Sequence, residues 1–130
     1  MDILLLAAET MISHTLQRML ESHSDWTVSR WFNPDIERIE QQNKADSFDG
    51  IIVNLLDFVN FYISVIHKIR REFPELPLLA VSNYADDLLI EPLLAAGADG
   101  YLQLGCSDED LHSAVESILN RQRCIITENT

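Results

Sequence analysis

The strongest constraint on the fold is a short apolar run, Gly50 to Val53, that ends abruptly at Asn54. An unbroken apolar run of this kind is typical of a strand buried on both faces in the middle of a parallel sheet. In open sheets of this type, ligands bind and reactions take place just beyond the carboxyl ends of the central strands. Asn54 therefore lies where such a fold would place a working residue, and it offers an uncharged amide that is a poor nucleophile.

Apolar segments of two kinds alternate along the rest of the chain. Short apolar runs typical of buried strands occupy residues 3–8, 50–54, 78–82 and 100–104, and residues 26–31 alternate apolar and polar side chains as an edge strand does. Between them, apolar residues recur at the helical spacing, which predicts helices that begin near Thr10 or Glu9, Pro34, Asp57, Asp86 and Ser107. Strands and helices that alternate in this way predict a doubly wound α/β domain with a parallel sheet, right-handed crossovers and helices on both faces.

The composition fits one globular domain and argues against nucleic acid and membranes as partners. The chain has 130 residues, of which 47% are apolar, enough for a buried core. Its 21 acidic and 9 basic residues give a formal net charge of −12, which repels phosphate backbones and disfavours direct nucleic-acid binding. No apolar run approaches the length of a membrane span, and the short acidic N-terminus is unlike a secretory signal. We therefore expect no membrane contact and a cytoplasmic location.

Cys106 and Cys124 flank the last predicted helix. A helix of about 15 residues separates its ends by roughly 22 Å, whereas a disulfide needs Cα atoms within about 7 Å of each other. We therefore expect two free thiols, in agreement with a reducing cytoplasm. The histidines show no metal-binding spacing.

Four stretches follow one another in a recognisable order: Ile3–Leu6, Phe48–Val53, Leu76–Ser82 and Ala95–Leu102. The last one reads Ala-Ala-Gly-Ala-Asp-Gly-Tyr-Leu, and the third ends in a hydroxyl. Together they resemble the receiver domains of bacterial two-component response regulators, over about residues 2 to 122. The resemblance implies a flavodoxin-like, doubly wound, five-stranded parallel sheet of order 2-1-3-4-5 with helices on both faces. It makes residues 1–122 a receiver-like domain and residues 123–130 a C-terminal tail or the start of a linker.

The resemblance also implies a phosphorylation pocket, which this sequence has lost in most of its parts. Two acids that hold Mg²⁺ in the family correspond to Ala7 and Ala8, the phosphoacceptor Asp to Asn54, and the Lys after the fifth strand to Leu104. Only the hydroxyl remains, at Ser82. Mg²⁺ needs carboxylate ligands, and phosphoryl transfer needs a nucleophile and positive charge on the moving oxygens. We therefore expect no enzymatic activity, no metal and no cofactor.

Polar residues near this pocket each have two interpretations. Asn54 either binds a small ligand or satisfies backbone groups of its own loop, which is the commoner role of such an amide. Glu9 and Asp57 either hold a cation together or cap the helices that follow them, and capping is again the commoner role.

In the family, the surface of the fourth helix, fifth strand and fifth helix forms dimers or meets partner domains. Here that surface would include Leu88, Leu89, Tyr101 and His112. Tyr101 falls on the family's aromatic switch position, where it is either a switch or a fixed packing or interface residue.

The sequence therefore predicts a pseudo-receiver, a phosphorylation-independent regulatory domain that acts by protein-protein interaction in bacterial signal transduction and transcription control. Its expected partners are a second copy, in a weak homodimer, and a partner protein or an attached output domain such as a helix-turn-helix. Two alternatives stay open. One is an active phosphoacceptor domain that uses a substitute acid such as Asp57, and the other is a small-ligand sensor at the neutral pocket.

Overall fold

The computed structural model of the chain describes residues 1–8, 10–31, 48–58, 62–83, 87–105 and 107–127. The strands are β1 (Asp2–Leu6), β2 (Thr27–Trp31), β3 (Gly50–Asn54), β4 (Leu78–Ser82), β5 (Gly100–Gln103) and β6 (Cys124–Ile126). The α-helices are α1 (Met11–Glu21), α3 (Tyr62–Glu72), α4 (Asp87–Ala96) and α5 (Asp108–Leu119), with a 3₁₀ turn, η2, at Leu55–Phe58. The helix predicted to open at Pro34 lies outside the described residues.

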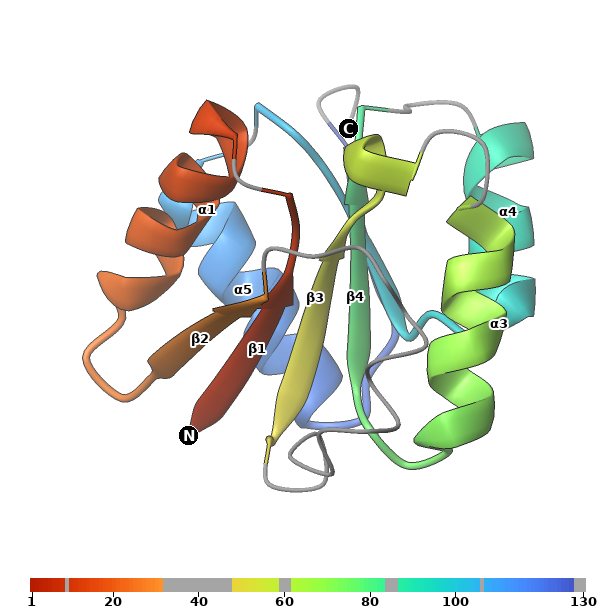
Figure 1. Ribbon diagram of the computed structural model, residues 1–130, viewed down its shortest axis with the longest axis horizontal. Helices are drawn as coiled ribbons and strands as arrows, with labels where there is room; N and C mark the ends of the chain where they lie inside the picture. The colour runs from red at the N-terminus through yellow and green to blue at the C-terminus, as the bar shows by residue number, and fades with distance from the viewer. Residues whose placement is uncertain (9, 32–47, 59–61, 84–86, 106, 128–130) are drawn as a thin grey trace.

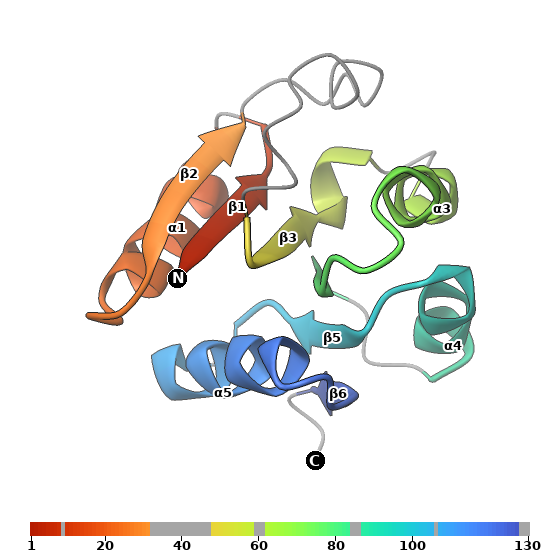
Figure 2. The same ribbon diagram turned by 90° about the horizontal axis from the view of Figure 1, so that it is seen from below.

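The strands form one parallel sheet of order β2-β1-β3-β4-β5-β6. Helices α1 and α5 cover one face of this sheet, and α3 and α4 cover the other (Figures 1 and 2). The doubly wound α/β architecture and the order of the first five strands are as predicted. Because both faces of the sheet are covered, all five residues of β3 and of β4 are buried.

The prediction of five strands was wrong by one, since Cys124–Ile126 adds a sixth within the segment expected to leave the domain. The chain turns back directly after α5, where Arg121 adopts a left-handed φ of 62° and Gln122 N–H donates to the Ser117 carbonyl at 2.8 Å. The β-branched Ile125 and Ile126 then pair with β5. A strand of three residues is too short to give a periodic signal in the sequence.

The helix predicted to open at Asp57 begins later, at Tyr62. Asp57 instead lies inside η2, the 3₁₀ turn that follows β3 directly. The predicted apolar face of α3 is nevertheless confirmed where it is described, because Val65, Ile66 and Ile69 are all buried in the core between α3, α4 and the sheet.

Arg70, near the end of α3, ties several turns together at the edge of the α3–α4 layer. Its Nε and Nη2 donate to the Gly97 carbonyl at 3.0 and 2.8 Å, and Nη2 also donates to Asp99 Oδ2 at 2.7 Å. Its Nη1 donates to the carbonyls of Phe73, Pro74 and Leu76 in the α3–β4 connection. Asp99 Oδ2 accepts a further bond from Leu78 N–H at 2.8 Å. A guanidinium is the one side chain with enough donors for this set.

None of the described helices is both long and apolar enough to cross a membrane.

We expect Arg70→Met to destabilise the domain by about 2–3 kcal/mol, because backbone carbonyls of two turns lose their partners while the apolar stem is kept. Arg71→Met is the matched control, since Arg71 is its exposed neighbour on the same helix, and it should change stability by less than about 0.5 kcal/mol. Urea unfolding of both variants measures the difference. Equal effects of the two substitutions would contradict the assignment.

Candidate functional site

The carboxyl ends of four neighbouring strands bring the predicted pocket positions to one edge of the sheet. Leu6 pairs with Val53, Asn54 with Val81, and Ser82 with Gln103, so β1, β3, β4 and β5 end side by side. The five pocket residues end these strands or follow them at once: Ala7, Ala8, Asn54, Ser82 and Leu104. Sequence reasoning therefore placed these positions together correctly.

Asn54 is 1% exposed, and its side chain serves the local backbone. Its Oδ1 accepts a hydrogen bond from Leu56 N–H at 3.2 Å, which holds the start of η2. This is the loop-satisfying role expected of the amide. Nearby, the loop after β5 is fastened to β4, because Leu104 N–H donates to the Ser82 carbonyl at 2.7 Å.

The pocket positions provide no charge. Ala7 and Ser82 are each 1% exposed, and Ala8 and Leu104 are half-buried. Glu9 lies outside the described residues, as does the side chain of Asp57, so the suggested cation site between them falls outside the description. Among the side chains that are described, no three of His, Cys, Asp or Glu are grouped to share a metal ion. Among the described side chains, the five pocket positions therefore offer the hydroxyl of Ser82 and an amide of Asn54 whose oxygen already accepts a hydrogen bond.

An apolar cavity of about 410 Å³ lies beside this edge, between α1 and the end of β5. It is lined by Met11, Ile12, Thr15, Leu16, Met19, Leu102, Gln103, Leu104 and Gly105. Leu104, which stands where the family has its lysine, is thus part of an apolar wall. The sequence alone did not indicate this cavity, because its walls come from the two ends of the chain.

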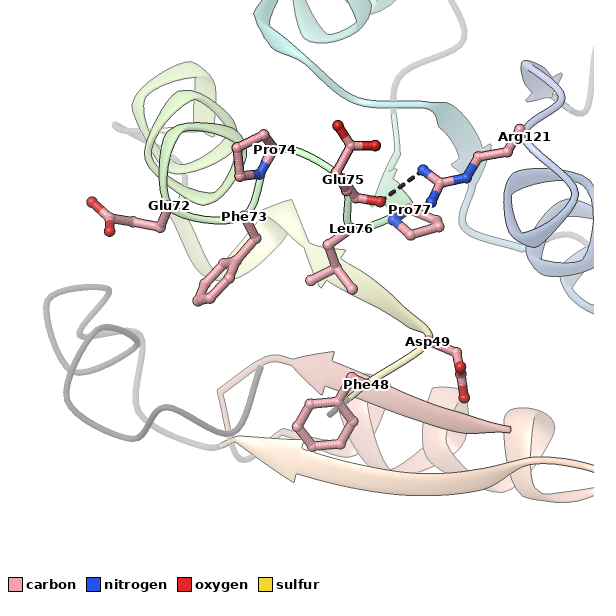
Figure 3. Close-up of a pocket in the computed structure, with 9 residues that line it drawn as sticks. All are labelled: Phe48, Asp49, Glu72, Phe73, Pro74, Glu75, Leu76, Pro77 and Arg121. Carbon is pink, nitrogen blue, oxygen red and sulfur yellow. Dashed lines mark hydrogen bonds between the residues drawn. The ribbon is translucent and has the colours of Figure 1, made fainter. Parts of the chain in front are cut away.

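A second cavity, of about 390 Å³, lies at the opposite, amino-terminal end of the sheet. Phe73 and Leu76 point into it from the α3–β4 connection, and Phe48 faces them from the start of β3 (Figure 3). Arg121 closes one side by donating from Nη1 to the Glu75 carbonyl at 2.7 Å. Sequence reasoning missed this cavity, because only the left-handed turn after α5 brings Arg121 there.

The four residues predicted to form one interaction surface lie in different places. Leu88 and Leu89 on α4 are 81% and 43% exposed, whereas Tyr101 is fully buried. Tyr101 projects from β5 into the core that the sheet shares with α3 and α4, so it cannot contact a partner in this structure. The predicted surface is therefore corrected at this residue.

His112 is the second correction to that surface, because it faces α1. Its Nε2 lies 2.6 Å from the Met19 carbonyl, and its ring meets Trp26 edge-on with centroids 5.3 Å apart. His23 stacks on the same Trp26 at 3.9 Å and contacts Glu116 of α5 through Nε2 at 3.1 Å. The cluster fastens the end of α1 to α5.

Cys124 is a free thiol, as predicted, and Cys106 lies outside the described residues. Burial raises the pKa of the Cys124 thiol, while a hydrogen bond with Ser117 acts in the opposite direction. A thiol of raised pKa is protonated at neutral pH and therefore unreactive.

Comparison with known proteins identifies the fold. No protein-family model matches the sequence, and no curated protein sequence matches it. A LuxR-family two-component response regulator from Aurantimonas sp. is similar in structure, with a TM-score of 0.83 and 18% identity over 98% of this chain and 90% of that chain. A LuxR-family DNA-binding response regulator from Silicibacter pomeroyi has a TM-score of 0.77 and 20% identity over 100% of both chains.

A putative pilus assembly protein, CpaE, from Burkholderia thailandensis is also similar, with a TM-score of 0.77 and 20% identity over 92% of this chain and 99% of that chain. The chain therefore has the fold of response regulator receiver domains, as the sequence resemblance predicted. Identities this low establish the fold, and the function has to be argued from the site.

We expect Asn54→Asp to make stability depend on pH. A carboxylate at this buried position is desolvated with no described cation at the pocket positions, so its pKa rises above the unfolded value near about 3.9. The variant should therefore match the native chain at acid pH and lose about 2 kcal/mol as the pH rises to neutrality. Urea unfolding at several pH values measures this trend.

Asn54→Ala is the control for that variant, because it removes the bond to Leu56 N–H without adding charge. Its loss of about 1 kcal/mol should be the same at every pH. A pH-independent effect of Asn54→Asp would show that a positive group compensates the new carboxylate.

We also expect no Mg²⁺ site of sub-millimolar affinity at the ends of β1 and β3, because Ala7 and Ala8 offer no carboxylate. Calorimetric titration of the native chain with Mg²⁺ should show only the heat of dilution. Saturable binding that is lost in Asp57→Asn would instead favour a substitute metal site.

Proposed function

We propose that this chain is a pseudo-receiver, a regulatory domain that acts by protein-protein interaction and without phosphorylation. The observation that carries the proposal is the neutral pocket. The ends of β1, β3 and β5 offer Ala7, Asn54 and Leu104 where phosphoryl transfer needs metal ligands, a nucleophile and a cation. The Oδ1 atom of Asn54 already accepts a hydrogen bond from its own loop. Partial loss would leave a weak enzyme, but loss of all three parts leaves no route.

The three replacements also support one another electrostatically. A buried lysine at the Leu104 position would lack a counter-ion once the acids were absent, and acids at the Ala7 and Ala8 positions would lack a cation once the lysine was absent. A neutral set is therefore a self-consistent state of this pocket. It allows the domain to hold one conformation without a phosphoryl signal.

The structural neighbours support a place in bacterial signalling. One is a LuxR-family two-component response regulator, and another is a DNA-binding response regulator. We propose that this domain likewise regulates transcription, through an attached output domain or a separate partner protein. A net charge of −12 makes protein the preferred partner of the domain itself. The proposed location is the cytoplasm.

Treatment with acetyl phosphate and Mg²⁺ tests the proposal. The native chain should gain no phosphate-mass adduct by intact mass spectrometry, under conditions that label an ordinary receiver domain. Asn54→Asp alone should also stay unlabelled, because the transferring oxygens still lack charge neutralisation. Labelling of the native chain, for example at Asp57, would overturn the proposal.

Restoration of the complete set provides the positive control. The variant with Ala7→Asp, Ala8→Asp, Asn54→Asp and Leu104→Lys should be labelled, provided that circular dichroism confirms its fold. The four changes act as one unit, so the gain should be strongly non-additive. Rapid labelling of Asn54→Asp alone would mean that the pocket retains a metal or a cation.

A small-ligand sensor is the second candidate, and the apolar cavity between α1 and β5 favours it. Its volume of about 410 Å³ lies within the range of small-molecule sites, and none of the described residues that line it is charged. A thermal-shift screen of uncharged apolar compounds tests this function. A true ligand should raise the melting temperature of the native chain, and Leu16→Trp, which fills the cavity, should abolish the shift.

A further inference from the structure

The open edge of the sheet next to α4 and α5 is formed by β6. In the part of the chain that the structure describes, β5 pairs with β6 and no strand pairs with the outer side of β6. An open edge strand presents unpaired backbone N–H and C=O groups to any other strand. Its three residues, Cys124 to Ile126, include neither a charge nor a proline, which are two of the usual means of blocking such an edge.

The register of β6 places apolar residues on the α4 side of this edge. Ile125 pairs with Tyr101, and paired residues of parallel strands point to the same face. Tyr101 belongs to the core shared with α3 and α4, so Ile125 lies on that face and is 39% exposed. Leu88 and Leu89 are exposed on α4, which covers the same face (Figure 2).

The other face of the edge carries opposite charges at its two ends. The first turn of α5 contains three acids, Asp108, Glu109 and Asp110, of which Asp108 and Glu109 are exposed. Arg121 and Arg123, both exposed, lie in the turn that leads into β6. Because α5 connects the parallel strands β5 and β6, its acidic end lies where β5 ends and the basic turn lies where β6 begins.

We propose that two copies of this chain associate edge to edge, with β6 of one copy pairing antiparallel with β6 of the other. A two-fold axis perpendicular to the sheet makes the surface self-complementary. The basic turn before β6 of each copy then meets the acidic first turn of α5 of the other copy. Leu88, Leu89 and Ile125 of both copies form one apolar layer on the α4 face. This homodimer would be one form of the protein-protein interaction proposed above, and the inference therefore rests on that proposed function.

Charge reversal tests this arrangement in the complete chain. Sedimentation equilibrium from micromolar to millimolar concentration should show a monomer-dimer equilibrium for the native chain. Arg123→Glu and Glu109→Arg should each weaken the homodimer at least about tenfold, because like charges then face each other across the axis. Glu109 is chosen because the Ser107–Asp110 capping box does not include it. Arg71→Glu, on α3, is the matched control and should leave the dimer unchanged.

Mixing the two single variants makes the test specific to the antiparallel geometry. A heterodimer of Arg123→Glu with Glu109→Arg restores an opposite-charge pair at both ends, so the mixture should dimerise about as well as the native chain. Leu88→Ser should weaken every dimer, and thermal unfolding should show that all variants fold.

Three results would overturn the inference. The native chain could stay monomeric at millimolar concentration, or its dimer could keep the same dissociation constant after both charge reversals. The mixture of the two variants could also dimerise no more tightly than either variant alone. Such a failure would leave the phosphorylation-independent role intact, because that role is measured separately by mass spectrometry after acetyl phosphate treatment.

Discussion

The guanidinium of Arg70 is the interaction on which the arrangement of the α3–α4 layer depends. It binds the carbonyl of Gly97, which ends α4, and three carbonyls of the α3–β4 connection, so it fixes both turns that lead into β4 and β5. Asp99 completes the junction by bonding both Arg70 and Leu78 N–H at the start of β4. The strands that lead to Ser82 and Leu104 are thereby positioned from their amino-terminal ends.

Two features differ from the receiver domain that the sequence resemblance implies: the neutral pocket and the sixth strand. In the pocket, charged groups are replaced by Ala7, Asn54 and Leu104, and the strand ends are held by backbone bonds such as Leu104 N–H to the Ser82 carbonyl. At the sheet edge, β6 pairs with β5, so that Ile125 lies beside the buried Tyr101. Both features agree with the constant interaction surface that is proposed for this domain.

Much of the fold could be predicted from the sequence, because buried strands such as Gly50–Asn54 and helix faces such as Val65, Ile66 and Ile69 carry strong periodic signals. The pocket positions could also be placed, since parallel strands end at a common edge. The exposure of Tyr101 and the direction of His112 could not, because they depend on packing against α3 and α4 and on contacts with α1 that are distant in sequence. The later start of α3 was missed because Asn54 initiates a 3₁₀ turn through a bond that periodicity does not reveal.

The strand order also has a consequence for synthesis on the ribosome. After β2 pairs with one side of β1, β3 pairs with the other side of β1, and β4, β5 and β6 then each pair with the strand before them. The nascent sheet can therefore grow in the order of translation, and no completed strand has to separate to admit a later one. Until β3 emerges, however, the apolar β1 has one unpaired side, which makes the early nascent chain the stage most exposed to misassociation.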